Sequence, residues 1–388
     1  MTLGAPYQGL RVLDLSTNIA GPFAALILGD LGADVIKVER PPHGDDTRAL
    51  PPRWNGESTV FLAMNRNKRS VLLDFKSAEG REILLKLADT ADVVIESFPP
   101  GLADKLSLRY ADFKARNPKI ILCTISAFGT GPLGSKMPGY DALVQAASGM
   151  MSFTGHPGAP PLRIAPSVLD LSTGLWGTIG TMAALARRAQ TGVGEWVTPS
   201  LIDSAFTLMC HQLLGFLATG EHPQKLGSGA PSAAPYGVFP ARDGDLMIAT
   251  ASEPQFPRLC RALGMETAAS DPHFSTMAAR LENRERLNAL IAEHIVKEPV
   301  DHWLTLLGNA GISVCRVNML DDALNMPVTQ ERQLFVAPER YHGEGGMPLL
   351  RLPIDEDGSF VRRPPPKLGE HTEEILREAG LTAGEMRD

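Results

Sequence analysis

The chain has 388 residues, of which 44% are hydrophobic and 21% charged, a mixture that is typical of globular proteins and excludes a disordered, collagenous or coiled-coil chain. Its 37 Lys and Arg residues stand against 44 Asp and Glu, and the net charge of -7 argues against nucleic acid or an anionic membrane as a partner. The length favours two domains, or one large domain with an insertion.

The first 130 residues alternate between short β-rich runs and helical segments. Strands are expected at residues 10–15, 34–39, 70–75, 92–97 and 119–126. Helices are expected between them, at residues 23–33, 79–91 and 108–118. Because helical crossovers connect the strands, they should pair in parallel. This part of the chain therefore predicts a doubly wound α/β sheet.

The remainder of the chain is less regular. Residues 130–170 are rich in Gly and Pro, and long irregular segments inside a compact protein are usually functional. A long helix is expected at 174–190, followed by a second helical run to about residue 218. From residue 236 to 325, short strands, a hairpin turn at Asp243-Gly244 and two helices predict a smaller α+β unit.

Targeting and metal-binding signals are absent from the sequence. The four cysteines (Cys123, Cys210, Cys260 and Cys315) form no C-x-x-C pair and no grouping with histidine, so we expect free thiols and no metal site. The first residues lack the pattern of a signal peptide, and no apolar run approaches the roughly 18–20 residues that span a bilayer. These features predict a cytoplasmic protein.

The segment after the first expected strand turns into a helix at Gly21-Pro22. A Rossmann dinucleotide site would carry G-x-G-x-x-G here, and this chain does not. The helix N-terminus is suited to an anion, but the pair is equally typical of a simple tight turn. Ligands of open α/β sheets bind at the carboxyl ends of the strands, where several cations would suit a phosphorylated ligand. Basic residues are expected at these ends or in the loops after them, although each alone is typical of a solvated surface charge: Lys37, Arg40, Lys68, Arg69, Lys76 and Lys105.

Asp170 lies directly before the helix expected from Gly174. One interpretation makes it an N-cap or first-turn acid, with Ser172 and Thr173 as competing caps. The other makes it a nucleophile or base at a loop-to-helix junction, kept ionised by the helix dipole and close to amides that stabilise an oxyanion. The residues alone leave both interpretations open.

Five sequence blocks together resemble the class III CoA-transferases, the formyl-CoA transferase and carnitine CoA-transferase family of CaiB/BaiF type. They run in the same order over nearly the whole chain: GLRVLDLSTNIAGPFAALILGDLGADVIKVERPPHGDDTR, NRNKRSVLLDFKSAEGREILLKLADTADVVIESFPPG, PGYDALVQAASGMMSFTG, VLDLSTGLWGTIGTMAAL and PKLGEHTEEIL. The resemblance implies a large Rossmann-like domain built from both chain ends (1–218 and 330–388) and a smaller inserted α+β domain (225–325). It also implies an interlocked homodimer, in which each chain threads through its partner.

The resemblance also assigns site residues. The family's catalytic aspartate falls on Asp170. Its coenzyme A contacts fall on Ile19, Ala20, Arg40, Leu73, Asp74, Phe75, Lys76, Ser97, Phe98, Pro99, Lys105, Pro138, Gly139, Tyr140 and Asp141. Formyl-CoA transferase has glutamine, arginine and lysine where this chain has Ile19, Lys105 and Pro138, and its run of glycines is reduced here to Gly227-Ser228-Gly229. These departures weaken the case for formyl or oxalate specificity, but not for CoA binding.

The implied reaction moves CoA from an acyl-CoA to a free carboxylic acid through a mixed anhydride and an aspartyl-CoA thioester on Asp170, without a metal. A small dicarboxylic acid is preferred as substrate, with succinyl-CoA as donor, and its recognition is expected in the small domain and the 225–237 loop. Arg163 either pairs with the distal carboxylate of that acid or forms a structural ion pair. An α-methylacyl-CoA racemase is an alternative, but that branch uses a histidine where this chain has Tyr140, and an ordinary tyrosine, with a pKa of about 10, is a poor base. A non-catalytic CoA-binding protein is the second alternative.

Overall fold

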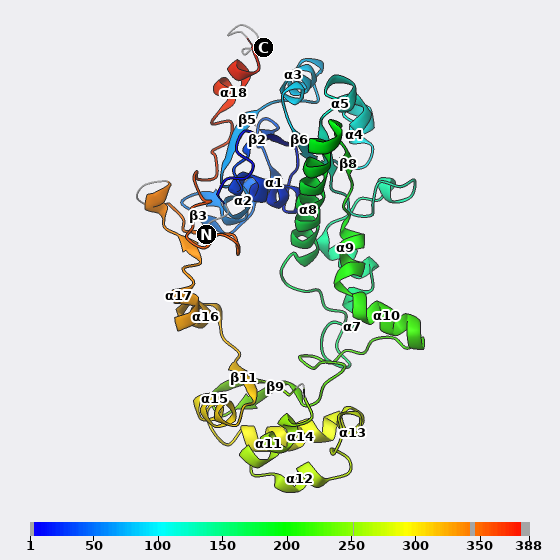
Figure 1. Cartoon of the computed structure of the whole chain (residues 1–388), viewed down its shortest axis with the longest axis vertical. Helices are drawn as coiled ribbons and strands as arrows, with labels where there is room; N and C mark the ends of the chain where they lie inside the picture. Colours follow the sequence, from blue (N-terminus) through cyan, green and yellow to red (C-terminus); the bar gives the residue numbers. More distant parts are fainter. Residues whose placement is uncertain (1–3, 251, 342–345, 382–388) are drawn as a thin grey trace. The chain divides into compact units, whose positions relative to one another are not determined.

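The computed structural model describes residues 4–250, 252–341 and 346–381 (Figure 1). The chain divides into two compact units. The first comprises Met1–Met150, Ile164–Leu214 and Arg332–Asp388, and the second comprises Met151–Arg163 and Gly215–Glu331. Both ends of the chain therefore contribute to the first unit. Residues 151–163, which the sequence placed with the large domain, group with the second unit.

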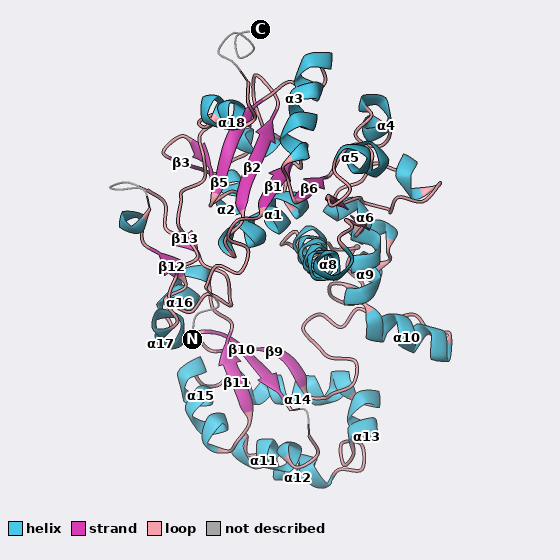
Figure 2. Ribbon diagram, turned by 45° about the horizontal axis from the view of Figure 1, so that its top comes forward, coloured by secondary structure: helices cyan, strands magenta, loops and turns pink. Residues whose placement is uncertain are grey.

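A six-stranded parallel sheet forms the centre of the first unit (Figure 2). Its strands lie in the order β5 (Lys68–Leu72), β2 (Asp34–Glu39), β1 (Arg11–Asp14), β6 (Val93–Glu96), β7 (Ile121–Thr124) and β8 (Trp196–Val197). The parallel pairing predicted for the first five strands is confirmed. The sequence missed β8, because two residues carry no periodicity and only pairing with β7 makes them a strand.

Helices cover both faces of this sheet. Because side chains alternate along a strand, Leu13 and its neighbours Ile36 and Val94 point to one face, where they share a core with α3 (Ala78–Asp89), α5 (Tyr110–Arg116) and α18 (Thr372–Glu378). On the other face α1 (Ala20–Asp30) packs against β1, β2 and β6, and α8 (Val168–Thr191) packs against β7 and β8. The C-terminal α18, red in Figure 1, contacts the edge strand β5.

Helix α8 begins at Val168, six residues before the start expected near Gly174. The sequence was wrong here because the first amides of α8 are capped by a side chain from another helix, which no local pattern reveals. Gly174 allows α8 to approach α1 closely, since a Cβ at this position would lie 2.7 Å from the carbonyl oxygen of Ala20. The helix ends at Thr191 and is capped by Gly192, whose positive φ of 73° terminates the helix.

The second unit contains an antiparallel sheet in the order β11 (Ser313–Arg316), β10 (Gly244–Ala249) and β9 (Tyr236–Ala241). The hairpin expected at Asp243-Gly244 is present, with Arg242 and Asp243 joining β9 to β10. The helices α11 (Gln255–Ala262), α14 (Arg284–Ile295) and α15 (Val300–Asn309) share an apolar core with this sheet. Residues 236–325 thus contain both the strands and the helices that the sequence predicted.

The other elements are short. In the first unit they are β3 (Arg53–Trp54), β4 (Glu57–Ser58), α2 (Thr59–Met64), α4 (Leu102–Leu106), α6 (Asp141–Ala147), α9 (Leu201–Leu208), β12 (Phe335–Val336), β13 (Leu349–Leu350) and the 3-10 turns η1 (Asp46–Ala49), η2 (Gly134–Lys136) and η3 (Pro338–Arg340). The second unit adds α12 (Glu266–Ser270), α13 (Met277–Glu282), α16 (Leu320–Asn325) and α17 (Pro327–Glu331), while α7 (Met150–Phe153) and α10 (Cys210–Thr219) cross from one unit to the other.

Among the described residues no single helix is long and apolar enough to cross a membrane, although α9 and α10, which meet at a bend of 70°, together reach the required length and composition.

Candidate active site

The loops that follow β1, β2, β5, β6 and β7 all leave the carboxyl edge of the sheet, because these strands are parallel. Each loop carries some of the predicted CoA contacts. Ile19 and Ala20 follow β1, Arg40 follows β2, residues 73–76 follow β5, residues 97–99 follow β6, and residues 138–141 follow β7. Lys105 lies on α4, just after residues 97–99. The fold therefore brings segments that are far apart in the sequence to one edge of the sheet, where ligands of this fold class bind.

Direct contacts join several of these loops. The backbone N–H of Thr17 donates a hydrogen bond to Oγ of Ser97 at 3.2 Å, and the rings of Phe75 and Phe98 lie 5.8 Å apart. A small pocket opens beside them. It is lined by Leu15, Ser16, Thr17, Lys37, Val38, Glu39, Arg40, Gly44, Asp45 and Phe75. The loops after β1, β2 and β5 thus form one continuous surface.

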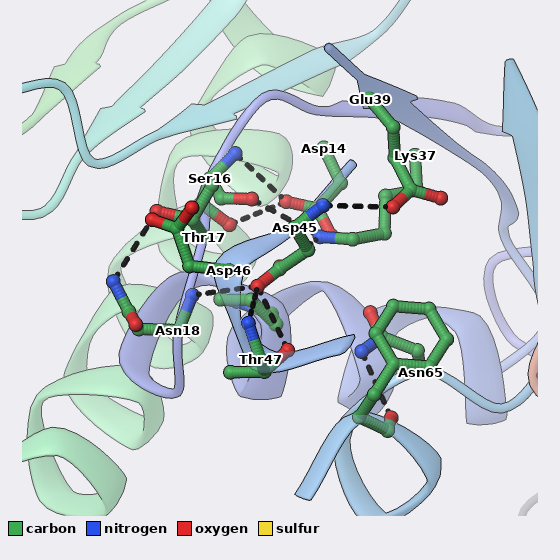
Figure 3. A network of polar contacts seen from close by, with 12 residues as sticks. Asp14, Ser16, Thr17, Asn18, Lys37, Glu39, Asp45, Asp46, Thr47 and Asn65 are labelled. Carbon is green, nitrogen blue, oxygen red and sulfur yellow. Dashed lines mark hydrogen bonds and ion pairs between the residues drawn. The ribbon is translucent and has the colours of Figure 1, made fainter. Parts of the chain in front are cut away.

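Two buried lysines, Lys37 and Lys68, pair with acids near this pocket, and Figure 3 shows Lys37 beside Asp14 and Asp45. Nζ of Lys68 lies 2.8 Å from Oδ2 of Asp14, and Nζ of Lys37 lies 2.8 Å from Oδ2 of Asp45. Burial acts to raise the pKa of Asp14, but the charges of Lys37 and Lys68 outweigh it and lower that pKa to about 2. Burial lowers the pKa of Lys68 to about 8, although the charge of Asp14 opposes this shift. These four residues form a buried cluster in which the positive charges of Lys37 and Lys68 are neutralised by Asp14 and Asp45.

Six basic residues were predicted to suit a phosphorylated ligand, but three of them form ion pairs with acids of the protein instead. Lys37 and Lys68 are buried in the cluster. Arg69 lies 2.6 Å from Asp34 and also pairs with acids of α18. Lys68 and Arg69 begin β5 and do not lie at its carboxyl end, so this part of the prediction was wrong. Arg40, Lys76 and Lys105 do reach solvent.

Asp170 is the third residue of α8, so the structure places it in the first turn of the helix. The N-cap position belongs to Ser167, and neither Asp170 nor the competing candidates Ser172 and Thr173 occupy it. The cap comes from α6 instead. Oδ2 of Asp141 accepts hydrogen bonds from the backbone N–H groups of Leu169, at 2.8 Å, and Asp170, at 3.2 Å. A buried carboxylate thus holds the backbone of the candidate nucleophile.

Gln145, one turn further along α6, completes this arrangement. Its Nε2 donates to Oδ1 of Asp141 at 2.6 Å, and its Oε1 accepts the N–H of Ile164 at 2.8 Å. Gln145 is fully buried and so fixes the loop that leads into α8. The sequence reasoning missed Gln145, although an Asp and a Gln four residues apart at the start of a helix are a known stabilising pair.

The electrostatic environment of Asp170 differs from the expected one. Burial, followed by the charge of Asp141, raises the pKa of Asp170 to about 7. Burial and the like charge of Asp141 therefore oppose the effect of the helix dipole, which was expected to keep Asp170 ionised. Among the described residues the structure gives no hydrogen bond to the Asp170 carboxylate. The arrangement provides a basic carboxylate on a rigid backbone, which is suited to nucleophilic attack.

The 225–237 loop lies in the second unit, where it packs on residues 151–163. Nζ of Lys225 donates to the carbonyl oxygens of Ala159, at 2.6 Å, and Pro160, at 2.9 Å. The N–H of Gly227 donates to Gly155, and a Cβ at Gly227 would lie 2.7 Å from the ring of His156. Arg163 is exposed at the end of the same segment. The described residues include no group of three or more His, Cys, Asp or Glu side chains that would hold a metal ion.

Comparison with known proteins identifies the family. Residues 7–372 match the model of CoA-transferase family III. The chain belongs to this family. A succinate–glutarate CoA-transferase of Agrobacterium fabrum is 36% identical over 383 residues, which cover 96% of this chain and 95% of the relative. An acetyl-CoA:oxalate CoA-transferase of Acetobacter aceti is also 36% identical, over 378 residues, with the same shares covered.

A solved structure supports the same assignment. A CAIB/BAIF family protein from Brucella suis matches with a TM-score of 0.86 and 36% identity, over 97% of this chain and 100% of that one. The predicted α/β fold with a parallel sheet is confirmed by this likeness. The protein is an enzyme, a class III CoA-transferase, and CoA thioesters are the co-substrates of its family. These matches favour the transferase over the racemase and over a non-catalytic CoA-binding protein.

Proposed function

We propose that this family III CoA-transferase moves CoA from an acyl-CoA donor to a small dicarboxylic acid, with Asp170 as the covalent nucleophile. The position of Asp170 carries the proposal: a partly buried carboxylate with a pKa of about 7, on a backbone fixed by Asp141. The names of the two similar transferases, for succinate and glutarate and for oxalate, support the substrate class.

The reaction balances without a metal or a net proton. An oxygen of Asp170 attacks the thioester carbonyl carbon, the C–S bond breaks, and a mixed anhydride and CoA thiolate form. The thiolate attacks the aspartyl carbonyl, releases the donor acid and leaves an aspartyl-CoA thioester. The acceptor carboxylate attacks this thioester and releases CoA, which then attacks the acceptor acyl carbon and regenerates the carboxylate of Asp170. Because every intermediate is an activated acyl group, no ATP is required.

Positioning and basicity make this carboxylate an effective nucleophile. A group held near its attack geometry needs little further ordering, and a raised pKa makes the ionised form a stronger nucleophile. The amides of Leu169 and Asp170 are bonded to Asp141 and are not available to an oxyanion.

The carboxyl edge of the sheet is the proposed CoA site. The partly exposed Arg40 and the exposed Lys76 and Lys105 follow strands of this sheet, and their charges suit the phosphates of CoA. The carboxylate of Asp141 is occupied by three hydrogen bonds. We therefore expect the segment 138–141 to contact CoA through Tyr140 and its backbone, while the Asp141 side chain positions α8.

We also propose that the active form is the interlocked homodimer. One face of α8 packs on α1, but the opposite face is apolar as well and exposes Leu175, Trp176, Ile179 and Met182. A helix that is apolar on all sides is normally buried on all sides. Leu214 and Leu217 of α10 are exposed too. A second copy of the chain is the proposed cover for these side chains.

A substrate panel tests the proposed function. The purified enzyme is supplied with succinyl-CoA, acetyl-CoA or oxalyl-CoA and with a series of mono- and dicarboxylic acids, and new CoA esters are detected by mass spectrometry. We expect transfer to dicarboxylates of two to five carbons, and loss of all transfer in Asp170→Asn, with CoA binding retained. Asp203→Asn, at an exposed acid in the first turn of α9, is the matched control. Transfer by Asp170→Asn at the wild-type rate would contradict the covalent role, and exclusive use of monocarboxylates would contradict the substrate class.

A further inference from the structure

Asp45 is a buried carboxylate in the loop that follows β2, and it touches two of the loops at the carboxyl edge of the sheet (Figure 3). Its Oδ1 accepts hydrogen bonds from the N–H of Thr47, at 2.9 Å, from Oγ1 of Thr47, at 2.8 Å, and from the N–H of Asn18, at 3.3 Å. Asn18 belongs to the loop after β1. One carboxylate oxygen therefore joins the loop after β1 to the loop after β2.

The second oxygen of Asp45 provides charge compensation. Its Oδ2 lies 2.8 Å from Nζ of Lys37, which also donates to the carbonyl oxygen of Ser16 at 3.1 Å. Burial acts to raise the pKa of Asp45, but the charge of Lys37 outweighs it and lowers that pKa. The loop after β1 is therefore held at two points, by Asp45 at Asn18 and by Lys37 at Ser16. Because both charges are buried, removing the carboxylate of Asp45 leaves Nζ of Lys37 with only its longer acid contact, to Asp14 at 3.7 Å, which is unfavourable.

The ends of the loop after β2 are fixed as well. The backbone N–H of Asp45 donates to Oε2 of Glu39 at 3.0 Å, and the carboxylate of Glu39 pairs with Arg48 at 2.7 Å. The N–H of Gly44 donates to the carbonyl oxygen of Arg40 at 2.8 Å and closes a turn that begins at Arg40. A Cβ at Gly44 would lie 2.4 Å from Oε2 of Glu39, so only glycine fits this turn.

Arg40 is the part of this loop that reaches outward. Its side chain is partly exposed, lies 3.6 Å from the exposed Asp46, and borders the small pocket together with Thr17 and Phe75. Buried charged residues thus hold the loop on which Arg40 remains accessible to a ligand. Their bonds determine where the backbone of Arg40 lies relative to the loop after β1.

We propose that Asp45 is a positioning residue for acyl-CoA binding. It holds the loops 16–19 and 40–47 in their ligand-binding shape before CoA arrives, so that Arg40 meets a CoA phosphate without further ordering of the backbone. Preorganised loops raise affinity because less conformational entropy is lost on binding. The inference rests on the proposed function only in taking this edge as the CoA site, and it does not depend on the covalent role of Asp170.

The test compares Asp45→Asn with a matched buried aspartate. Asp30 is also fully buried and ion-paired, to Arg66 at 2.5 Å, but it ends α1 and so lies near the amino edge of the sheet. Asn at position 45 places an amide against the ammonium group of Lys37 and weakens the link between the loops. We expect Asp45→Asn to raise two constants at least tenfold: the Kd for CoA, measured by calorimetry, and the KM for acyl-CoA. The kcat and the KM for the acid should change less than threefold. Asp30→Asn should lower the melting temperature by a similar amount and leave both CoA constants unchanged.

A double-mutant cycle with Arg40 shows whether Asp45 acts through that residue. Because both changes affect the same contact, Asp45→Asn should raise the Kd for CoA much less in the background of Arg40→Ala than in the wild type. Equal CoA constants for Asp45→Asn and Asp30→Asn would overturn the proposal, as would additive effects of Asp45→Asn and Arg40→Ala. If the wild type binds CoA but transfers it to no acid, the proposed function fails while the calorimetric comparison still decides the role of Asp45.

Discussion

Asp141 and Asp170 are linked through a backbone amide: Oδ2 of Asp141 accepts the N–H of Asp170 at 3.2 Å. Two acids on different helices therefore lie close together, and among the described residues only the carboxylate of Asp141 accepts hydrogen bonds. Asp141 receives three such bonds, whereas the charge of Asp141 and burial raise the pKa of Asp170 to about 7. The two carboxylates therefore have different surroundings, and only Asp141 caps α8.

Removing the side chain of Asp141 should impair catalysis more than binding. Asp141→Ala leaves the first amides of α8 unpaired and lets Asp170 move, and a displacement of about 1 Å is sufficient to lower kcat about 100-fold. Asp141→Asn keeps an acceptor oxygen and should lose less activity. The measurement is kcat and the KM for acyl-CoA in both variants. A larger change in KM than in kcat would indicate that Asp141 contacts the ligand directly.

The activity should depend on pH through Asp170. Attack requires the carboxylate, so kcat/KM for acyl-CoA should fall about tenfold for each pH unit below about 7, where the pKa of Asp170 lies. In Asp141→Asn the like charge is absent, and this decline should begin at a lower pH. A profile that stays flat from pH 7 to pH 5 would contradict the raised pKa of Asp170.

The raised pKa of Asp170 should also affect the stability of the fold. Its contribution to stability should decrease as the pH rises, whereas activity should increase. The folded state binds a proton on Asp170 more tightly than the unfolded state, so this contribution to the free energy of unfolding is fully present below pH 4 and is lost as the pH rises to about 7. Asp170→Asn should therefore become more stable relative to the wild type across this window, by at most about 4 kcal/mol. Thermal unfolding of both proteins at pH 4 and pH 8 measures the difference.

Hydroxylamine should trap the covalent intermediates. During turnover its nitrogen attacks the aspartyl carbonyl, CoA leaves, and Asp170 becomes a hydroxamate that peptide mass spectrometry locates. The modification should require acyl-CoA and be absent without it. Modification of a different acid, or none at all during rapid turnover, would rule out the aspartyl thioester at Asp170.

Gln145 should contribute to stability through two buried hydrogen bonds. Gln145→Leu leaves the N–H of Ile164 and one oxygen of Asp141 without a partner, and each buried unpaired group costs about 1–3 kcal/mol. Urea unfolding of this variant should show a clear loss of stability. Gln190→Leu, at an exposed position of α8, serves as the control and should unfold like the wild type.

The apolar face of α8 should support self-association. Ile179→Glu places a charge on this exposed face, and light scattering should detect a shift from dimer to smaller or aggregated species. Gln190→Glu adds a charge at the polar C-terminal end of the same helix, next to Arg187 and Arg188 in the sequence, and should remain dimeric. A wild-type protein that is monomeric at micromolar concentration would contradict the proposed dimer.

The sequence predicted five strands of the central sheet because each lies in a short β-rich run and helical segments separate most of these runs. The order β5-β2-β1-β6-β7 follows the doubly wound pattern. The start of α8 and the strand β8 could not be predicted, since the first depends on a cap from Asp141 and the second on pairing with β7. Asp170 was identified from residues that match the family, and not from its local pattern, which suits an ordinary first-turn acid equally well.

The sequence by itself determined the parallel α/β sheet, the family and Asp170 as the candidate nucleophile, because periodicity and motifs are properties of the chain order. Only the tertiary structure decided which charged residues are available for chemistry. Lys37, Lys68 and Arg69 look like ligand-binding cations in the sequence, yet the folded chain pairs them with Asp14, Asp34 and Asp45. The physical reason is that a charge is neutralised by whatever lies within a few ångströms, and such neighbours come from residues that are distant in the sequence.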